Sequence, residues 1–158
     1  MSAIFSPCRT WRYRLERRWG EGPLVAFILL NPSTADETMD DPTIRRCIGY
    51  AKTWGYGGLV VGNIFALRST DPKVLQSADD PVGPENDEHL LAIAESASVV
   101  ICGWGAHGKI AGRGHEVMKL LQAHRPKYLK MTKLGAPQHP LYLKGDLTPR
   151  DWEKEGET

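Results

Sequence analysis

The chain contains one stretch in which apolar and polar residues alternate and three predominantly apolar runs. The alternation covers Thr10 to Trp19, and its period of two is typical of a half-buried strand at the edge of a sheet. The apolar runs cover Leu24 to Leu30, Leu59 to Ala66 and Ser98 to Cys102, as expected for strands that are covered on both faces. With a further short strand at Tyr128 to Met131, the pattern predicts a mostly parallel four-stranded central sheet with an N-terminal edge strand.

Helical spacing fills the intervals between these strands. The first predicted helix begins at Asp41-Pro42, which supplies an N-cap and a proline for the first turn, and ends at Gly55 or Gly57-Gly58. Two further helices are expected from Pro84 to Glu95 and from Gly108 to Ala123. Strands that alternate with helices build parallel crossover units, so the sequence predicts an α/β fold with three layers and a doubly wound sheet.

Neither a repeat nor a linker divides the sequence, so residues 1–158 are expected to form one domain, with a polar tail from about residue 146. Lys and Arg number 20 against 19 Asp and Glu, so the chain lacks the strong positive field of proteins that bind duplex DNA mainly through its phosphates. Five arginines crowd the N-terminal stretch, and we interpret them as a solvated strand face, the alternative being a local patch that contacts nucleic acid: Arg9, Arg12, Arg14, Arg17 and Arg18.

The cysteines and the lengths of the apolar runs indicate in which cellular compartment the protein is expected. Cys8, Cys47 and Cys102 are far apart and lack the spacing of metal ligands, which indicates free buried thiols in a reducing environment. No apolar run reaches the length of a membrane span. We therefore expect a cytoplasmic protein that has no membrane partner.

In a doubly wound sheet, ligands bind where the carboxyl ends of the strands open into loops. The segments just past the predicted strands are therefore the candidate site. They are Asn31 to Asp36, Asn63 with Arg68 to Asp71, Gly103 to Gly108, and Lys133 to Tyr142.

The first of these loops carries an amide, two hydroxyls and a carboxylate. A residue before proline avoids the helical backbone region, so Asn31 is expected to stay extended and to point its amide into the crevice. Ser33 and Thr34 can hold a phosphate or a water, and Asp36 lies within reach of the same loop. The alternative is a simple turn, because these residue types also favour turns.

The last loop carries His139 between Gln138 and Pro140, in a segment too rich in proline and glycine for a regular helix or a central strand. An imidazole in such a loop is free to donate. It can stabilise negative charge on a leaving group or act as a general acid. The alternative is a surface histidine in a structured loop.

Gly103 to Gly108 matches the pattern GxGxxG between a predicted strand and a predicted helix. The dinucleotide-binding fingerprint normally follows the first strand and has an acidic partner downstream, which this chain lacks. We interpret the segment as a backbone turn packed by Trp104, whose N–H groups can contact a phosphate. Asp36, Asp40 and Asp41 can bind a hard cation, but Asp41 is better explained as an N-cap, so we expect neither a metal nor another cofactor.

Five segments carry a resemblance to a known family: LLNPSTADETMDDPTIRRCIGYAKTWGYGGL, VVGNIFALRSTDPKVL, DPVGPEND, WGAHG and HPLYLKGD. Together they span about Arg12 to Asp146 and resemble the bacterial family known as domain of unknown function 1643. That resemblance implies no reaction.

Two of these segments are also distantly similar to the active-site motifs of the uracil-DNA glycosylase superfamily. Leu29-Leu30-Asn31-Pro32-Ser33 is similar to a strand-ending Gly-x-Asn-Pro loop that places the water. His139-Pro140-Leu141-Tyr142 is similar to a late His-Pro-Ser-Pro-Leu-Ser loop that supplies a histidine and enters the minor groove. Leu29 stands where the superfamily has glycine, and the second motif lacks the serines. The similarity implies a uracil-DNA glycosylase-like fold in which Asn63 serves as the amide that reads the base edge.

The resulting hypothesis is a nucleobase-recognising enzyme that hydrolyses an N-glycosidic bond in DNA or a nucleotide. Its catalytic residues would be Asn31, which orients water, His139, which receives charge, and Asp36, which assists. Its binding residues would be Pro32, Ser33, Thr34, Asn63, Arg68, Gly103, Trp104, Pro140 and Tyr142. One alternative is a non-catalytic nucleotide or nucleic-acid binding module on the same scaffold. Another is a metal-dependent phosphohydrolase built on Asp36, Asp40 and Asp41.

Overall fold

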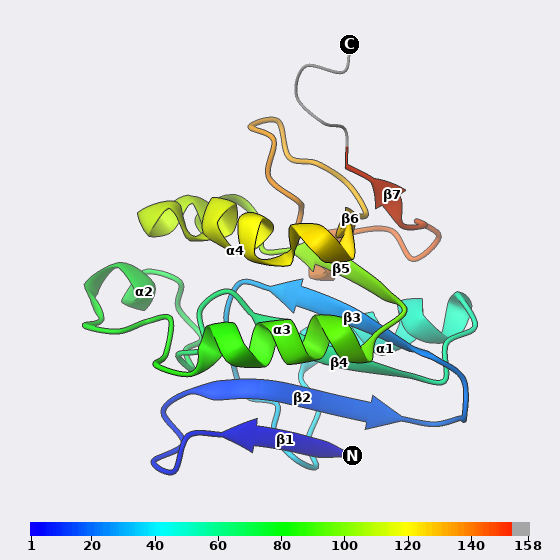
Figure 1. Ribbon diagram of the computed structural model, residues 1–158, viewed down its shortest axis with the longest axis horizontal. Coiled ribbons are helices and arrows are strands. Elements are labelled where there is room, and N and C mark those ends of the chain that lie inside the picture. Colours follow the sequence, from blue (N-terminus) through cyan, green and yellow to red (C-terminus); the bar gives the residue numbers. More distant parts are fainter. Residues whose placement is uncertain (153–158) are drawn as a thin grey trace.

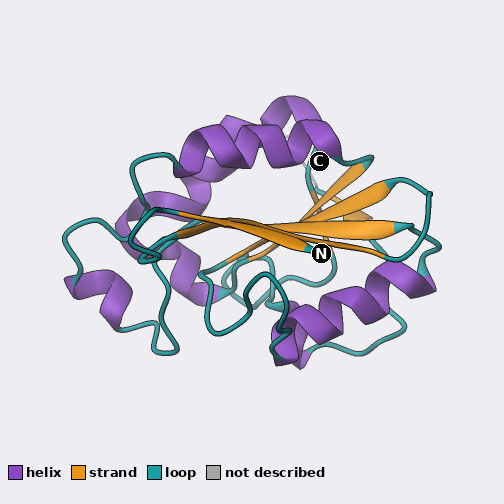
Figure 2. Cartoon of the chain, turned by 90° about the horizontal axis from the view of Figure 1, so that it is seen from below, coloured by secondary structure: helices purple, strands orange, loops and turns teal. Residues whose placement is uncertain are grey.

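In the computed structural model, which describes residues 1–152, the chain forms a seven-stranded sheet in the order β1-β2-β4-β3-β5-β6-β7. Helices lie on both faces of this sheet (Figures 1 and 2). The strands are β1 (Ser2–Phe5), β2 (Arg12–Arg18), β3 (Leu24–Leu29), β4 (Gly58–Asn63), β5 (Val99–Gly103), β6 (Lys127–Tyr128) and β7 (Arg150–Asp151). The helices are α1 (Pro42–Thr53), α2 (Val74–Ser77), α3 (Asn86–Ser96) and α4 (Arg113–Leu121), with 3₁₀ segments at Ala106–Gly112, Gln122–His124 and Pro140–Tyr142.

The centre of the sheet consists of the parallel strands β4, β3, β5 and β6. The chain passes from β3 through α1 to β4 on one side, and then from β4 through α3 to β5 on the other side of β3. The register pairs Leu29 of β3 with both Asn63 of β4 and Gly103 of β5, so three strands end at the same level. Ligands bind at such a switch point in doubly wound sheets.

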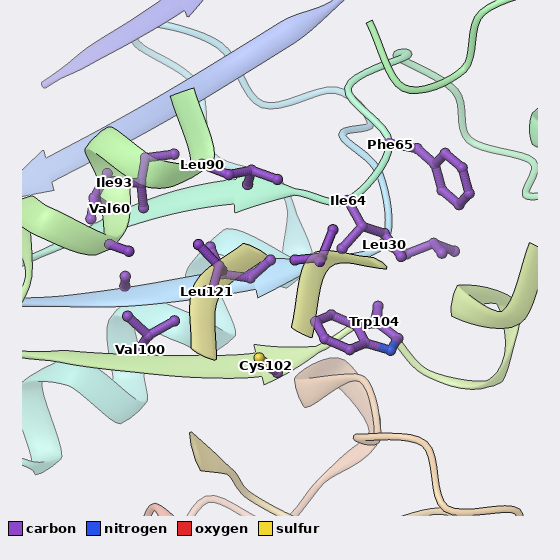
Figure 3. Packing of buried hydrophobic residues seen from close by; sticks show 14 of the residues in the cluster. Leu30, Val60, Ile64, Phe65, Leu90, Ile93, Val100, Cys102, Trp104 and Leu121 are labelled. Atoms are coloured by element: carbon purple, nitrogen blue, oxygen red, sulfur yellow. The ribbon is translucent and has the colours of Figure 1, made fainter. Parts of the chain in front are cut away.

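Side chains of the central strands alternate between two buried clusters, one on each face of the sheet. Ala26 and Ile28 face the cluster that includes residues of α3 and α4, whereas Val25 and Phe27 face the cluster that includes residues of α1. Figure 3 shows the first cluster, in which Trp104 lies at the same end as Leu30 and Ile64. This arrangement makes three layers, because every residue of β3 is buried from both sides.

The mixed α/β architecture agrees with the prediction, but the sheet is larger than expected. Instead of four central strands and one edge strand, it has seven strands, because β1 pairs with β2 and β7 pairs with β6. The segment Thr10 to Trp19 therefore contains a strand, β2, that is not at the edge. Strand β7 lies in the tail that was expected from residue 146, of which residues 153–158 lie outside the described part.

Three smaller expectations are also corrected. The helix predicted from Gly108 to Ala123 is interrupted, because Ile110 and Ala111 leave helical geometry before α4 begins. The strand predicted at Tyr128 to Met131 is reduced to the two residues of β6. Cys8 is exposed, whereas Cys47 and Cys102 are buried free thiols as expected. Within residues 1–152, no helix combines the length and the apolar character that a bilayer crossing requires.

Arg12 of β2 is buried, in contrast to the solvated strand face that the sequence indicated. Its guanidinium donates to the carbonyl of Ala35 at 3.1 Å and to Oδ1 of Asn63 at 3.3 Å. The first acceptor lies in the loop after β3, and the second ends β4. Burial lowers the pKa of Arg12 to about 10, so the side chain remains charged at neutral pH.

Arg17, further along β2, is buried against the same loop. Its Nε donates to Asp40 at 2.8 Å, and its Nη2 donates to the carbonyls of Asp36 at 2.5 Å and Met39 at 3.2 Å. Arg12 and Arg17, five residues apart on one strand, thus both hold residues 35–40. The arginine-rich strand serves as the support of the loop that follows Asn31.

Gly103, the last residue of β5, permits a close approach of the segment that carries His139. A Cβ on Gly103 would lie 2.9 Å from Cδ of Pro140 and 3.3 Å from the carbonyl oxygen of Gln138. It would also lie 3.3 Å from a side-chain carbon of Leu29. The His139 segment therefore packs directly on the carboxyl end of β5, next to β3.

Replacing Arg17 by methionine should lower the free energy of unfolding by about 2–3 kcal/mol, because Asp40 and the carbonyls of Asp36 and Met39 lose the hydrogen bonds that the buried guanidinium donates. Arg18→Met is the matched control: Arg18 is exposed and contacts Glu16 only at 3.9 Å, so its change should stay within about 0.5 kcal/mol. Urea denaturation of both variants measures the difference. Equal effects would show that Arg17 does not support the loop.

Gly103→Ala should lower the free energy of unfolding by about 1–3 kcal/mol, because the added methyl group overlaps Pro140 and Leu29. Gly49→Ala in α1 is the control. A Cβ there meets nothing within 4 Å, and the exchange should raise stability by roughly 0.5–1 kcal/mol, since alanine favours a helix. A destabilised Gly49→Ala or a neutral Gly103→Ala in urea denaturation would contradict this packing.

Candidate functional site

A cavity of about 630 Å³ opens where β3 and β5 end, at the switch point of the sheet. Its volume lies in the range of small-molecule sites, roughly 300–1,000 Å³. Segments that follow β3, β4 and β5 line it, together with the late segment around His139. The lining residues are Leu30, Asn31, Ser33, Thr43, Ser69, Thr70, Pro72, Trp104, Gly105, Ala106, His107, Thr132, Lys133, Gln138, His139, Leu141 and Tyr142.

Asn31 forms one wall of this cavity and presents a hydrogen-bond acceptor. Its Nδ2 donates to the carbonyl of Ser69 at 2.9 Å and to that of Pro32 at 3.1 Å. The amide of Ser69 donates in turn to Pro32 at 2.9 Å, so the two loops hold each other. Both N–H donors of the side chain are used in this way, and within residues 1–152 no group donates to its Oδ1. The free Oδ1 can accept a hydrogen bond from a water or a ligand.

His139 lies in the same cavity and presents a donor. The backbone amide of Leu141 donates to Nδ1 of His139 at 3.3 Å, so Nδ1 carries no proton and the neutral ring is protonated at Nε2. Burial lowers the pKa of His139 below its usual 6.5, while the charge of Asp41 opposes this shift. The ring is therefore a neutral N–H donor at physiological pH.

Backbone contacts hold the His139 segment above β5. The amide of Gly105 donates to the carbonyl of Pro137 at 2.7 Å, and the amide of Gln138 donates to the carbonyl of Lys130 at 2.8 Å. These bonds, together with the packing of Pro140 on Gly103, place the histidine opposite the segment after β3. Asn31 and His139 are thus brought together by two strand ends that are hydrogen-bonded neighbours.

Asp36, which the sequence indicated as a helper of catalysis, does not line the cavity. Its Oδ1 accepts from the backbone amides of Thr38 at 3.0 Å and Met39 at 2.8 Å, which lowers the pKa of the carboxyl group. This carboxylate stabilises a turn within its own loop. Its position makes it a structural residue of the loop rather than a reacting group.

Two aromatic rings meet the cavity in different ways. Trp104 is only 5% exposed, and a Cβ on Gly108 would overlap its indole ring. The absence of a side chain at Gly108 therefore leaves the space in which Trp104 packs. This matches the interpretation of Gly103 to Gly108 as a packed turn. Tyr142 is 79% exposed at the rim, and its ring centroid lies 6.2 Å from that of His139. Tyr142 is the ring with room to stack on a ligand.

The remaining predicted residues are divided between the cavity and its supports. Ser33 lines the cavity, whereas Arg68 lines a neighbouring hollow that also includes Ser33. Asn63 does not line the cavity; it is 2% exposed, and its Oδ1 accepts from Arg12. Pro32, Thr34, Gly103 and Pro140 do not line the cavity.

Several lining residues were not singled out from the sequence. Gln138 is half-buried and offers an amide beside His139, and Lys133 offers a cation at the rim. Both lie in the segment that was expected to follow the last strand, but nothing in the sequence shows which of its residues turn inward. Thr43 was hidden because residues at the start of a helix are interpreted first as capping residues.

The acidic residues that could form a metal site are engaged elsewhere. Asp41 caps α1 by accepting from the amide of Ile44 at 2.9 Å, and Asp40 pairs with Arg17. Among the residues that the structure describes, no three His, Cys, Asp or Glu side chains form a cluster able to hold a metal ion.

Comparison with known proteins relates the chain to a family. No curated protein and no solved structure matches the chain significantly. The family described as "Protein of unknown function (DUF1643)" matches residues 12–141, a segment that includes both Asn31 and His139. The match covers most of the 158 residues, and the chain therefore belongs to this family.

Proposed function

We propose that the protein recognises a nucleobase and hydrolyses an N-glycosidic bond in DNA or a nucleotide. The observation that carries the proposal is that Asn31 and His139, far apart in the sequence, line one cavity with complementary hydrogen-bonding groups. Asn31 offers the acceptor Oδ1 and His139 offers the donor Nε2–H. In this proposal one planar base accepts from His139 and donates to Asn31.

This chemistry needs charge stabilisation on two sides of the breaking bond. As the bond lengthens, the sugar becomes positive and the departing base becomes negative. The Nε2–H of His139 would donate a hydrogen bond to the departing base and stabilise its negative charge. The ring would keep its proton, as a preorganised neutral donor does. Asn31 would hold a water through Oδ1 on the side of the sugar. The water oxygen would form the new bond to the sugar carbon as the bond to the base breaks, and the proton that the water loses would pass through solvent to the departed base anion.

The lining residues from the described part of the chain include no carboxylate, and this limits the reaction. An amide orients water but does not remove its proton. The proposed enzyme is therefore slow and depends on departure of the base rather than on activation of water. The same observation favours a second candidate, a nucleotide or nucleic-acid binding module that uses the cavity without catalysis. The phosphohydrolase alternative has no such support, because Asp36, Asp40 and Asp41 are engaged outside the cavity.

The two motifs around Asn31 and His139 are distantly similar to those of the uracil-DNA glycosylase superfamily, and this similarity supports the proposal. We extend it to the fold: the four parallel strands β4, β3, β5 and β6, with the site at their carboxyl ends, form a uracil-DNA glycosylase-like sheet in this proposal.

Asn31→Ala and His139→Ala should each slow base release by roughly 10²-fold or more, because each removes one of the two groups that face the reacting bond. The assay follows release of free base from single-stranded and double-stranded oligonucleotides that contain uracil or modified bases, and from the corresponding nucleotides. His115→Ala, an exposed histidine of α4 outside the cavity, is the matched control and should keep the wild-type rate.

Unchanged rates in both Asn31→Ala and His139→Ala would eliminate the proposal. If the wild-type protein binds these substrates but releases no base, the binding module replaces it.

The rate of base release should stay constant from neutral to mildly alkaline pH. Because burial lowers the pKa of His139, the ring is neutral throughout this window and remains an Nε2–H donor. A positively charged histidine acting as acid would instead lose activity as pH rises through its pKa. Nitrogen NMR of the ring checks the same point directly. A ring protonated at Nδ1, or a pKa above the usual 6.5, would contradict the assignment.

A further inference from the structure

A second, shallower hollow of about 350 Å³ adjoins the cavity and shares three of its residues, Ser33, Ser69 and Thr70. Its other lining residues are Arg9, Thr10, Leu67 and Arg68. Two guanidinium groups and four hydroxyl groups therefore surround a space that opens on the rim of the proposed base site. Asn31 and His139, the two residues that carry the proposed reaction, do not line this hollow.

The two arginines are held on one aromatic ring. The guanidinium carbons of Arg9 and Arg68 lie 3.9 Å and 4.9 Å from the centroid of Phe5, a residue of β1. Arg9 is also bound at both Nη atoms by Glu37, at 2.7 Å and 2.8 Å. A guanidinium that lies over a ring keeps its N–H edge available for an anion.

Arg68 carries the unbalanced charge of the hollow. It forms an ion pair with no carboxylate of residues 1–152, whereas the charge of Arg9 is matched by Glu37. The hydrogen bonds and charge of Arg9, with a smaller effect of Arg68, lower the pKa of Glu37 to about 2, which shows that all three charges share one locality. The two charged residues that line the hollow are therefore both cations, and only Arg9 is paired with a carboxylate of the described chain.

The backbone around Arg68 is fixed before any ligand arrives. The amide of Arg68 donates to the carbonyl of Thr10 at 3.0 Å, and the amide of Ser69 donates to that of Pro32 at 2.9 Å. Trp11 and Leu67 form a bridge on the same side. Since Asn31 also holds the carbonyl of Ser69, the hollow and the base cavity form one rigid rim.

We propose that this hollow binds a phosphate group of the nucleotide whose base enters the neighbouring cavity, with Arg68 as its principal ligand. Planar guanidinium groups match phosphate oxygens through paired N–H donors, and hydroxyl groups complete the shell. The inference rests on the proposed function for the base, but the phosphate site itself does not require catalysis. The substrate class is thereby narrowed to phosphorylated nucleotides or a polynucleotide strand, and a free nucleoside would lack this anchor.

Titration with inorganic phosphate, followed by amide NMR, tests the site without reference to any base. We expect saturable shifts at Arg68, Ser69 and Thr70. Arg68→Gln should weaken binding roughly tenfold or more, because charge-assisted hydrogen bonds are lost. Arg18→Gln, an exposed arginine of β2 outside the hollow, is the matched control and should bind as the wild type does.

Glu37→Gln provides a test of opposite sign. It removes the carboxylate that competes for Arg9, so phosphate should bind more tightly than to the wild-type protein. Weaker or unchanged binding in Glu37→Gln would contradict the proposal. So would equal binding by Arg68→Gln and Arg18→Gln, or shifts confined to other parts of the chain. The same spectra show whether each variant is folded.

Two further experiments are needed. The first distinguishes a free nucleotide from a polynucleotide strand as the source of the phosphate, and the second distinguishes failure of the phosphate site from failure of the proposed function. Deoxyuridine, deoxyuridine monophosphate and a short single-stranded oligonucleotide containing deoxyuridine are compared at several salt concentrations. Strong binding of the monophosphate indicates a free nucleotide, whereas tighter binding of the oligonucleotide with a steep salt dependence indicates a strand. Asn31→Ala and His139→Ala should keep the phosphate response. If they do and the wild-type protein releases no base, the proposed function fails alone. If the wild-type protein releases base while Arg68→Gln binds phosphate normally, the phosphate site fails alone.

Discussion

The burial of two arginine guanidinium groups under one loop is the constraint on which the site depends. Removing such a charge from water costs several kcal/mol, and carbonyl and carboxylate acceptors must offset this cost. For Arg12 and Arg17, four of the seven acceptors lie in residues 35–40, and the others are Asn63, Ser2 and Glu16. The loop cannot leave the sheet without stranding both charges in the interior. Strand β2, which does not line the cavity, therefore helps to fix the position of Asn31 at the start of that loop.

Those parts of the fold that depend on local patterns could be predicted. The continuous apolar run at Leu24 to Leu30 and the Asp41-Pro42 cap correspond to β3 and α1, because burial on both faces and helix capping leave local signals. Strand β7 has no such signal. It is two residues long, both exposed, and it exists only because β6 offers a free edge. The residues of such a short strand do not by themselves indicate that they pair with a strand that is distant in the sequence.

The same distinction applies to the site. Asn31 and His139 could be selected because both follow strand ends, and position relative to the sheet is predictable from topology. The role of Asp36 could not be predicted, since a carboxylate within reach of a loop along the chain can turn away from the cavity and accept its own backbone amides. Arg12 and Arg17 were misinterpreted for a related reason. Alternation along a strand shows which residues share a face, but it does not reveal that a loop will cover that face.

The two walls of the cavity are anchored in different ways. The wall that carries Asn31 is tied to a central strand with a partner on each side, whereas the segment that carries His139 follows a strand of two residues. Beyond His139 this segment is anchored on α1 and the residue after it, because Leu143 is buried in the cluster that includes α1, Tyr50 donates to the carbonyl of Lys144, and Trp54 donates to that of Leu147. The position of His139 therefore depends on the packing of α1, whereas that of Asn31 depends on the pairing of the sheet.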